Sequence, residues 1–493
     1  MKANLSTIIA LLSFVNQLLF IAGQSNDELL FVFQLTKSGL SNGYGLNPFQ
    51  QYIDSGLLPD INSTYKQGEL SDMGRRQQFL LGQQLRLKYI EQKNLISQDL
   101  NPAEIFVRVQ NSNKSSESAE ALLHGLYSPN LQNQRVVMQD NQSASAIPEM
   151  QMHQELLSQS QTELANNPLP FNYYLPALNV YNRSQDLFNP LNTCPQIQND
   201  ILNRQQNLLA SKILDTKYQN SLINLAQILN ISPSLINSSI ALQYADTIAS
   251  LYLQQYQMPG LDRQLATDMI SLKKEFLNMT IGKNSTTNKA YLTTLFTEML
   301  NLFQSTIDLH SNGSLERAVN RIKYYMAFAE DELLINLARS VYYSKSRLLL
   351  NATSTVLFEL HKTVVEGETD PTYYVNMTIN GEQISLPGAC QNYKKCLYSS
   401  FVKLVKSSSY YGDQDSFEKV CGVLPEDNYN QIMNQWMGSF PENVVYMSHN
   451  YKRIIYAYVG LTIIILLIWL YWEKRKYRKR KQRTSGIEMS KQD

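Results

Sequence analysis

The sequence predicts an α/β protein with a mainly parallel central sheet flanked by helices, an inserted and mostly helical cap, and one C-terminal transmembrane helix. Three observations predict this arrangement. Before residue 131, apolar runs typical of buried strands alternate with helical patterns. Strand patterns then become scarce up to residue 313 and return afterwards. A hydrophobic segment of 19 residues without a charge, 454–472, lies near the C-terminus.

The first part of the chain predicts strand, loop and helix in alternation. Residues 29–35 form an apolar run interrupted by Gln34, which is typical of a strand buried on both faces of a parallel sheet. A helix is expected to begin at Ser71, and residues 105–109 predict a second strand. Apolar residues at helical spacing predict another helix over 118–126. Because ligands of such sheets lie at the carboxyl ends of strands, we expect the site in the loops after the two strands.

The middle of the chain has a different character. Residues 132–313 are rich in Gln and Asn, and their apolar residues recur at helical spacing, which predicts a helical cap. Strand patterns return at 323–328, 355–360 and 373–378. The last of these runs into Asn380-Gly381, a favoured hairpin turn. We therefore expect one domain whose core comprises residues 27–131 and 314–425.

The N-terminus has the pattern of a secretory signal peptide over residues 1–23. Lys2 precedes an apolar run that ends in the small residues Ala22 and Gly23. An N-terminal membrane anchor fits less well, because Asn16 and Gln17 interrupt the run. We therefore expect the mature chain to enter the secretory pathway.

The C-terminal region predicts a single-pass type I topology. Residues 454–472, at ~1.5 Å per residue, are long enough to cross a hydrocarbon core. The tail, 473–493, contains nine Lys and Arg against three acidic residues, which predicts a cytosolic C-terminus. Residues 24–446 are then extracellular or luminal, at the plasma membrane or an endolysosomal membrane, with 447–453 as a juxtamembrane segment.

The composition and net charge exclude two classes of protein. Hydrophobic residues make up 43% of the chain and the formal net charge is +1, which excludes a disordered chain and a basic protein that coats nucleic acid. Outside the tail, the chain has 34 basic and 39 acidic residues. The basic tail itself has two interpretations, recruitment of anionic lipids or an ordinary stop-transfer signal.

Cysteines and glycosylation sequons agree with an extracytoplasmic location. Four cysteines in an oxidising compartment predict two disulfides, in one of three connectivities: Cys194, Cys390, Cys396 and Cys421. No Cys/His spacing is typical of zinc, so we expect no metal and no cofactor. Eleven Asn-x-Ser/Thr sequons lie between the signal peptide and the span: Asn62, Asn113, Asn141, Asn182, Asn230, Asn237, Asn278, Asn284, Asn312, Asn351 and Asn376.

Five segments in order resemble the histidine acid phosphatase family, over most of residues 28–417 outside the cap. They are Phe31-Val32 leading to Lys37-Ser38-Gly39, the helical motif 69–82, the stretch 108–127, the strand 355–360 and Leu386-Pro387-Gly388-Ala389-Cys390 through Cys396. The resemblance implies the fold of that family. It also implies a short disulfide between Cys390 and Cys396, which leaves Cys194 and Cys421 for the second.

The resemblance further implies a chemistry from which this sequence departs. The family uses a His nucleophile, cationic groups that hold the phosphate, and a His-Asp pair whose Asp protonates the leaving oxygen. None of the five histidines falls at either catalytic position. The degenerate positions are Lys37 for an Arg, Ser38 for the nucleophile, Ser41 for a second Arg and Glu330 for the other His. Asp331 and the phosphate-binding Arg108 are retained.

These losses predict a pseudoenzyme, used as a binding or assembly module. A carboxylate at Glu330, ~5 Å from a phosphate charge, would cost roughly 3 kcal/mol per charge pair. A glycan on Asn113 would obstruct the mouth of the site. The expected partners are the membrane and another extracytoplasmic protein, or a phosphorylated ligand held by Arg108 and Lys37, but not nucleic acid. The alternative is a membrane-bound acid phosphatase of reduced or altered activity on phosphomonoesters, in which Ser38 or an outside nucleophile attacks.

Overall fold

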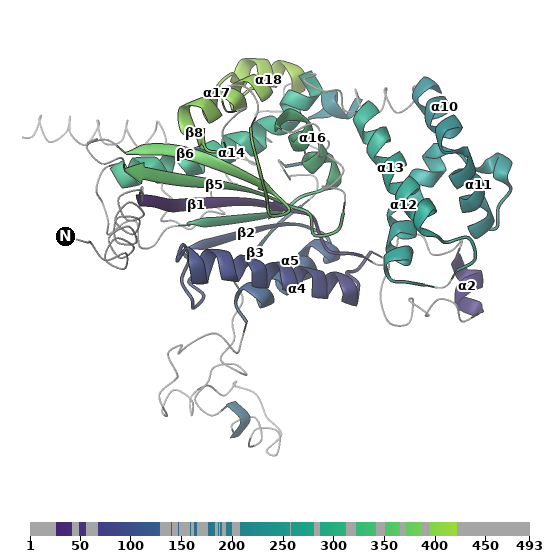
Figure 1. The fold of residues 1–493 in the computed structure, drawn as a ribbon, viewed down its shortest axis with the longest axis horizontal. Coiled ribbons are helices and arrows are strands. Elements are labelled where there is room, and N and C mark those ends of the chain that lie inside the picture. The colour runs from purple at the N-terminus through teal and green to yellow at the C-terminus, as the bar shows by residue number, and fades with distance from the viewer. Residues whose placement is uncertain are drawn as a thin grey trace, which may run out of the picture. The chain divides into compact units, whose positions relative to one another are not determined.

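The computed structural model (Figure 1) describes much of the region between the predicted signal peptide and the predicted span. The residues described are 26–41, 49–55, 68–128, 176–182, 194–199, 208–256, 258–280, 286–311, 322–341, 351–364, 371–386 and 394–421, with short pieces that include Asp186, Phe188, Asn189 and Cys390. The signal peptide, the span 454–472 with its flanking segments, and the sequons at Asn62, Asn141, Asn284 and Asn312 lie outside them. Within the described part of the chain, no helix has both the length and the apolar character needed to span a bilayer.

The core is an eight-stranded mixed sheet with the order β3-β2-β4-β1-β5-β6-β7, and β8 pairs with β6. The strands are β1 (Asn26–Thr36), β2 (Ile105–Gln110), β3 (Leu178–Tyr181), β4 (Tyr324–Phe328), β5 (Thr355–Val364), β6 (Thr372–Ile379), β7 (Glu382–Ile384) and β8 (Cys396–Leu397).

The prediction of a mainly parallel sheet was wrong for half of it. From β3 to β1 the strands are parallel, but β5, β6, β7 and β8 pair antiparallel. For β6 and β7 the reason is the short connections that follow β5, since antiparallel neighbours need only a tight turn and parallel ones need a crossover. The predicted turn between β6 and β7 is present, with φ of 49° at Asn380 and 82° at Gly381.

Strand β1 is buried between β4 and β5, as its apolar run predicted. The ring of Phe33 stacks on Tyr325 of β4 at 4.7 Å between centroids, and Tyr325 stacks on Phe106 of β2 at 5.1 Å. Gln34, the polar residue within the run, accepts a hydrogen bond from Tyr324 Oη at 2.6 Å. The buried amide therefore has a partner, and the strand needs no access to water.

Two helices cover one face of the sheet: α4 (Asp72–Arg86), which continues as the π-helix η2 (Leu87–Gln92), and α5 (Asn113–Leu126) (Figure 1). The predicted start of the first helix is confirmed, because Ser71 Oγ accepts the Gly74 N–H at 3.0 Å. The two helices approach closely at Gly82 and Gly125. A Cβ at Gly82 would collide with the carbonyl oxygen of Leu122, so the contact requires glycine.

The other face is covered by α14 (Thr286–Ser311), α16 (Asp331–Val341), α17 (Tyr398–Ser408) and α18 (Gln414–Cys421) (Figure 1). Phe303 of α14 packs edge-on against Phe31 of β1 at 5.7 Å, and Phe401 of α17 lies 5.9 Å from Phe358 of β5. Helix α14 and strand β3 both come from the segment 132–313. That segment therefore supplies part of the core as well as the cap.

The cap helices lie beyond the carboxyl end of β1 (Figure 1). They enclose a hydrophobic cluster of their own, in which Leu225, Ile248 and Met269 are fully buried. Ser250 Oγ of the cap donates a hydrogen bond of 2.7 Å to the Ser41 carbonyl of the core. The cap helices are α2 (Gln50–Asp54), α10 (Leu208–Lys217), α11 (Gln219–Ile228), the 3-10 turn η6 (Pro233–Leu235), α12 (Ser238–Leu253) and α13 (Arg263–Thr280).

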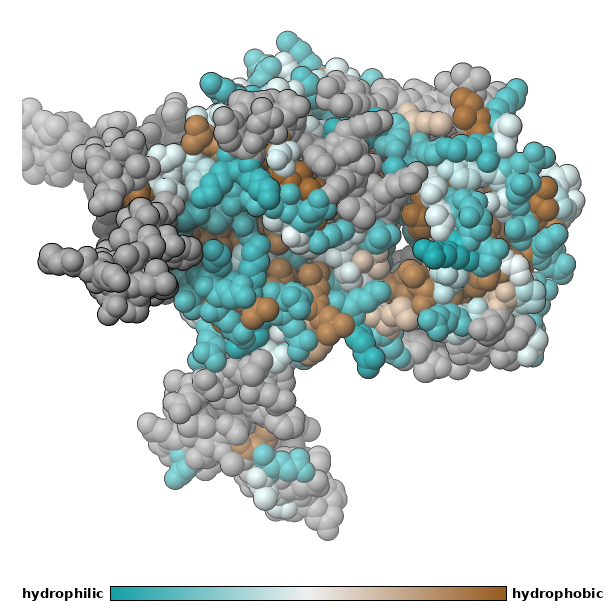
Figure 2. Space-filling model, viewed as in Figure 1, coloured by the Kyte–Doolittle hydropathy of each residue, from teal (hydrophilic) through white to brown (hydrophobic). Residues whose placement is uncertain are grey.

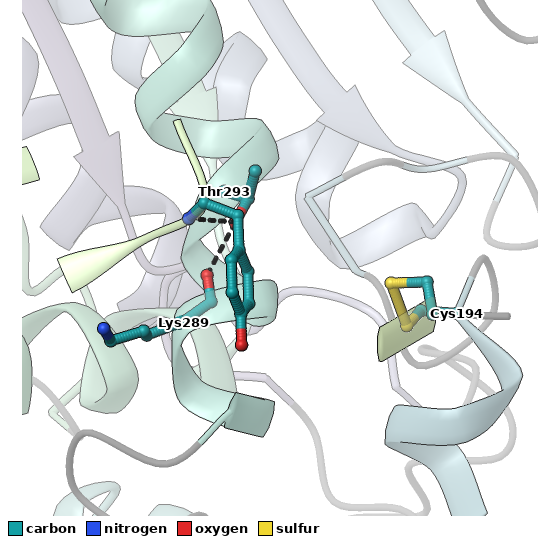
Figure 3. The surroundings of a disulfide bond; sticks show 5 residues. Cys194, Lys289 and Thr293 are labelled. Atoms are coloured by element: carbon teal, nitrogen blue, oxygen red, sulfur yellow. Dashed lines mark hydrogen bonds between the residues drawn. A yellow bond between two sulfur atoms is a disulfide. The ribbon is translucent and has the colours of Figure 1, made fainter. Parts of the chain in front are cut away.

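Both predicted disulfides are present, Cys390–Cys396 and Cys194–Cys421. The second joins residues 227 positions apart (Figure 3). Beside it, Thr293 Oγ1 of α14 donates to the Lys289 carbonyl at 2.7 Å and accepts the Tyr410 N–H at 3.1 Å (Figure 3). These bonds fix the segment that leads into α18, the helix that carries Cys421.

Candidate functional site

A pocket of about 180 Å³ lies where the carboxyl ends of β1 and β4 face the cap. The surface is hollowed at the junction of core and cap helices (Figure 2). The pocket collects five of the six catalytic or phosphate-binding positions that the sequence singled out: Lys37, Ser38, Ser41, Glu330 and Asp331. Helices α12 and α13 of the cap complete its wall.

A chain of alternating charges crosses this pocket from core to cap. Lys37 Nζ lies 2.7 Å from Asp331 Oδ1, and Lys273 Nζ of α13 lies 2.5 Å from Asp331 Oδ2. The same Lys273 ammonium lies 2.6 Å from Asp246 Oδ2 of α12. Asp331 therefore has one lysine on each carboxylate oxygen. We call these four residues the charge relay.

The charge relay fixes the ionisation of Asp331. Burial alone would raise the pKa of its carboxyl, but the Lys37 and Lys273 ammonium groups outweigh that effect and hold the pKa well below its usual range. Burial lowers the pKa of Lys273, yet Asp331 and Asp246 raise it above its usual value. Asp331 is thus an anion at every pH at which proteins ordinarily work, and an ionised carboxylate has no proton to give to a leaving group.

The pocket as a whole does not favour an anion. Its lining contains three lysines, Lys37, Lys114 and Lys273, and four acidic residues, Asp246, Glu330, Asp331 and Glu332. Lys114 Nζ lies 3.9 Å from Glu330 Oε2. Burial and the neighbouring Asp331 and Glu330 carboxylates raise the pKa of Glu332. The lysines are thus balanced by carboxylates, where a phosphate site needs unbalanced positive charge.

A sequence model described as Histidine phosphatase superfamily (branch 2) matches residues 41–380, more than half of the chain. The chain belongs to this superfamily. Lysophosphatidic acid phosphatase type 6 of Homo sapiens is 32% identical over 107 residues, 21% of this chain and 24% of that protein. The Mus musculus protein of that name is 34% identical over 95 residues, 19% and 22% of the two chains. The matches thus span about a quarter of these relatives.

Solved structures agree on the histidine phosphatase fold. Hafnia alvei phytase in complex with myo-inositol hexakis sulphate has a TM-score of 0.51 at 15% identity, covering 81% of this chain and 99% of that one. The apo form of the same phytase has a TM-score of 0.50. At this identity the likeness shows the fold alone.

Ser38 is the residue that we expected at the nucleophile position, and its hydrogen-bond partner is a hydroxyl group. Its Oγ lies 3.4 Å from Ser115 Oγ of α5, which also receives a hydrogen bond of 3.0 Å from Ser112 Oγ. The histidines among the described residues, His124, His310 and His361, do not line the pocket. Within the described part of the chain, the hydrogen bond of Ser38 Oγ is to another hydroxyl, which is not the general base that a serine nucleophile requires.

The position of Arg108 in the structure differs from the one expected from the sequence. We expected it to bind phosphate, but it is not among the described residues that line the pocket, and it is 2% exposed. Its Nη2 donates to Asp186 Oδ1 at 2.6 Å, and its Nη1 lies 4.0 Å from Glu298 Oε2. The guanidinium also lies 3.7 Å from the ring of Tyr181 and 4.1 Å from that of Phe188. Both carboxylates come from the segment 132–313, so no local motif around Arg108 could have revealed them.

The cap residues Lys273 and Asp246 were missed by sequence analysis. Nothing in the local sequence pattern of α12 or α13 distinguishes these two residues from other charged residues on exposed helix faces. Lys273 is 58 positions from Asp331 in the sequence. One signal was present: we expected Asp331 to be retained without its neighbouring histidine, and a buried carboxylate requires another partner.

The described sequons differ sharply in exposure. Five of the asparagines are exposed: Asn113, Asn182, Asn230, Asn237 and Asn351. Asn278 is partly buried. Asn376 lies inside β6 with 8% exposure, and its Nδ2 is 3.3 Å from His361 Nε2. A buried, hydrogen-bonded amide has no room for a glycan, so Asn376 does not suit the glycosylation expected from its sequon.

Proposed function

We propose that this chain is a catalytically degenerate histidine phosphatase, a type I membrane glycoprotein whose ectodomain acts as a binding or assembly module. The observation that carries the proposal is the charge relay. Asp331, the only member of the expected His-Asp pair that the sequence retains, is held between Lys37 and Lys273 at 2.7 and 2.5 Å. A residue in that position can neither donate a proton nor leave its two lysines available to a phosphate.

The energetics support the same conclusion. A phosphate that uses Lys37 and Lys273 would have to compete for them with Asp331, whose side chain is 8% exposed. Lys273 already contacts a second carboxylate, Asp246. Breaking a buried ion pair by removing one partner costs about 3–5 kcal/mol. The phosphate would also enter a pocket that already has one more carboxylate than it has lysines.

The two disulfides support an oxidising compartment, as the proposed signal peptide requires. The exposed sequons and the uncharged segment 454–472 favour a glycosylated ectodomain on a membrane anchor. In this arrangement the pocket faces the extracellular or luminal side. The expected partners are another extracytoplasmic protein or a phosphorylated ligand that is not turned over.

A second candidate is a membrane-bound phosphomonoesterase of reduced activity. It is supported by the match to lysophosphatidic acid phosphatase type 6, which covers 24% of the human protein. The site gives this candidate less support. Ser38, at the expected nucleophile position, has no general base as a hydrogen-bond partner among the described residues.

The test is a phosphatase assay on the full-length chain in detergent micelles, with p-nitrophenyl phosphate from about pH 4 to about pH 8. We expect no turnover above buffer from the wild type. Ser38→His/Glu330→His should restore the nucleophile position, and adding Lys273→Met should raise the rate further by releasing Asp331.

The matched control for that third change is Lys217→Met. Lys217 is another cap lysine, paired with Glu275 at 2.5 Å outside the pocket, and its loss should leave the rate unchanged. Wild-type turnover that disappears in Ser38→Ala would overturn the pseudoenzyme proposal in favour of the second candidate.

A further inference from the structure

One sequon lies on the rim of the pocket. Asn351 lines the pocket and is exposed, so its side chain borders both the cavity and solvent. Its sequon, Asn351-Ala352-Thr353, forms the loop before β5, and Ala352 also lines the pocket. Asn113, the sequon that we expected to obstruct the mouth, is not itself among the described lining residues.

The loop that carries Asn351 is fixed to the floor of the pocket. The Thr353 N–H donates to the Ser38 carbonyl at 3.1 Å, and the Lys37 N–H donates to the Ser354 carbonyl at 2.8 Å. Ser354 N–H in turn donates to the Asn351 carbonyl at 3.2 Å. A group attached to Asn351 is therefore anchored by a backbone bonded to the same residues, Lys37 and Ser38, that form the degenerate site.

We propose that an N-linked glycan on Asn351 covers the mouth of this pocket and excludes macromolecular ligands from it, while small molecules still enter. The inference rests on the proposed function, since it requires a glycoprotein. In the reaction, the Asn351 side-chain nitrogen forms a bond to C1 of the first sugar of a lipid-pyrophosphate-linked oligosaccharide. The bond from C1 to the pyrophosphate oxygen breaks, the pyrophosphate leaves with its electron pair, and the amide releases one proton.

Asn376 provides the contrast within the same chain. It is 8% exposed, lies opposite Glu359 in the β5–β6 pairing, and its amide nitrogen is 3.3 Å from His361. A glycan there would have to displace His361 and the other side chains that bury the amide. Both sequons have Thr at the third position, so that residue does not distinguish them. The exposure of the asparagine side chain does.

The first experiment measures site occupancy on the full-length chain from a eukaryotic secretory host. Enzymatic deglycosylation in heavy-oxygen water, followed by peptide mass spectrometry, marks each occupied asparagine. We expect Asn351 to be occupied and Asn376 to be unoccupied. Occupancy at Asn182 or Asn237 with an unmodified Asn351 would overturn the inference and leave the glycoprotein proposal standing. No occupancy at any sequon would overturn both.

The second experiment measures access to the pocket. Lys114 lines it and its side chain is 23% exposed, so amine-reactive esters can report on the mouth. With a polyethylene-glycol ester of about 5 kDa, labelling of Lys114 relative to the exposed Lys212 should rise about fivefold or more in Asn351→Gln. Acetylation by a small ester should change less than about twofold.

The matched control is Ser239→Ala, which removes the Asn237 sequon. Asn237 is at the start of α12, away from the lining, and its side chain continues to accept the Ile240 N–H at 3.0 Å. Ser239→Ala should leave Lys114 labelling unchanged. If Asn351→Gln also leaves polymer labelling unchanged although Asn351 is occupied, the glycan does not cover the pocket and the inference is overturned.

Discussion

Two buried charge clusters contain the two charged residues that we expected to be retained at one site, and the two clusters are different kinds of structure. In the charge relay, one carboxylate, Asp331, lies between two lysines and joins the core to the cap beside a cavity. In the Arg108 cluster, one cation lies between Asp186 and Glu298 and between two aromatic rings, inside the core. The first connects elements around a pocket, whereas the second is part of the core packing.

The comparison shows that a charged residue at an expected site can be paired with partners from elsewhere in the chain. Arg108 and Asp331 both remain, but each has acquired partners from the segment 132–313. These partners satisfy the charge that a substrate would otherwise satisfy. Retention of a residue type at a catalytic position is therefore weak evidence for the catalytic role until its partners are known.

The largest expected effect comes from removing the cation of the core cluster. Arg108→Met should lower the free energy of unfolding by about 3–5 kcal/mol, because Asp186 and Glu298 stay buried and lose the Arg108 guanidinium. Urea denaturation followed by circular dichroism measures this. Arg75→Met is the control, since the Arg75–Glu117 pair is partly exposed to solvent and should contribute less than about 1 kcal/mol. Equal losses in the two variants would mean that the Arg108 cluster is not a distinct core element.

A smaller effect is expected at the relay. Lys273→Met should cost about 1–3 kcal/mol, because Asp331 keeps Lys37 and Asp246 is 59% exposed and can be solvated. The loss should appear mainly as faster amide hydrogen exchange in α12 and α13. Lys217→Met, which breaks an exposed cap pair, should leave that exchange unchanged. If exchange in α12 and α13 stays slow in Lys273→Met, the relay does not hold the cap.

The smallest effect concerns pH. The pKa of Asp331 is lowered in the folded chain, because the Lys37 and Lys273 ammonium groups outweigh the effect of burial, so its contribution to stability is complete above its ordinary value of 3.8 and is lost as the pH falls below it. Between pH 6 and pH 3 this amounts to about 1 kcal/mol. Asp331→Asn should flatten the pH dependence of urea denaturation by that amount over this interval. An unchanged slope would mean that Asp331 is not held as an anion by its lysines.

The sequence predicted what depends on neighbours along the chain. The apolar run of β1, the cap at Ser71 and the turn at Asn380-Gly381 all follow from local patterns, and all are present. The place of the pocket followed from strand order, because the ends of parallel strands meet at one edge.

What the sequence could not predict depends on contacts between distant segments. Asp186 is 78 positions from Arg108, and Lys273 is 58 from Asp331. Whether a charged residue on a helix faces solvent or a buried carboxylate is set by packing, which periodicity does not encode. Strand β3 has only four residues, with no buried run to reveal it, and it forms by pairing with β2.

The Cys194–Cys421 disulfide has a mechanical consequence. A pull on the chain beyond Cys421 reaches the fold at that residue and passes through the sulfur atoms directly to Cys194. The intervening loop, which includes α10 to α14 and strands β4 to β8, carries no tension while the bond is intact. Stretching the protein between its ends would therefore extend only the residues before Cys194 and after Cys421. Most of the pocket wall and three of the four relay residues lie within the loop that this disulfide closes.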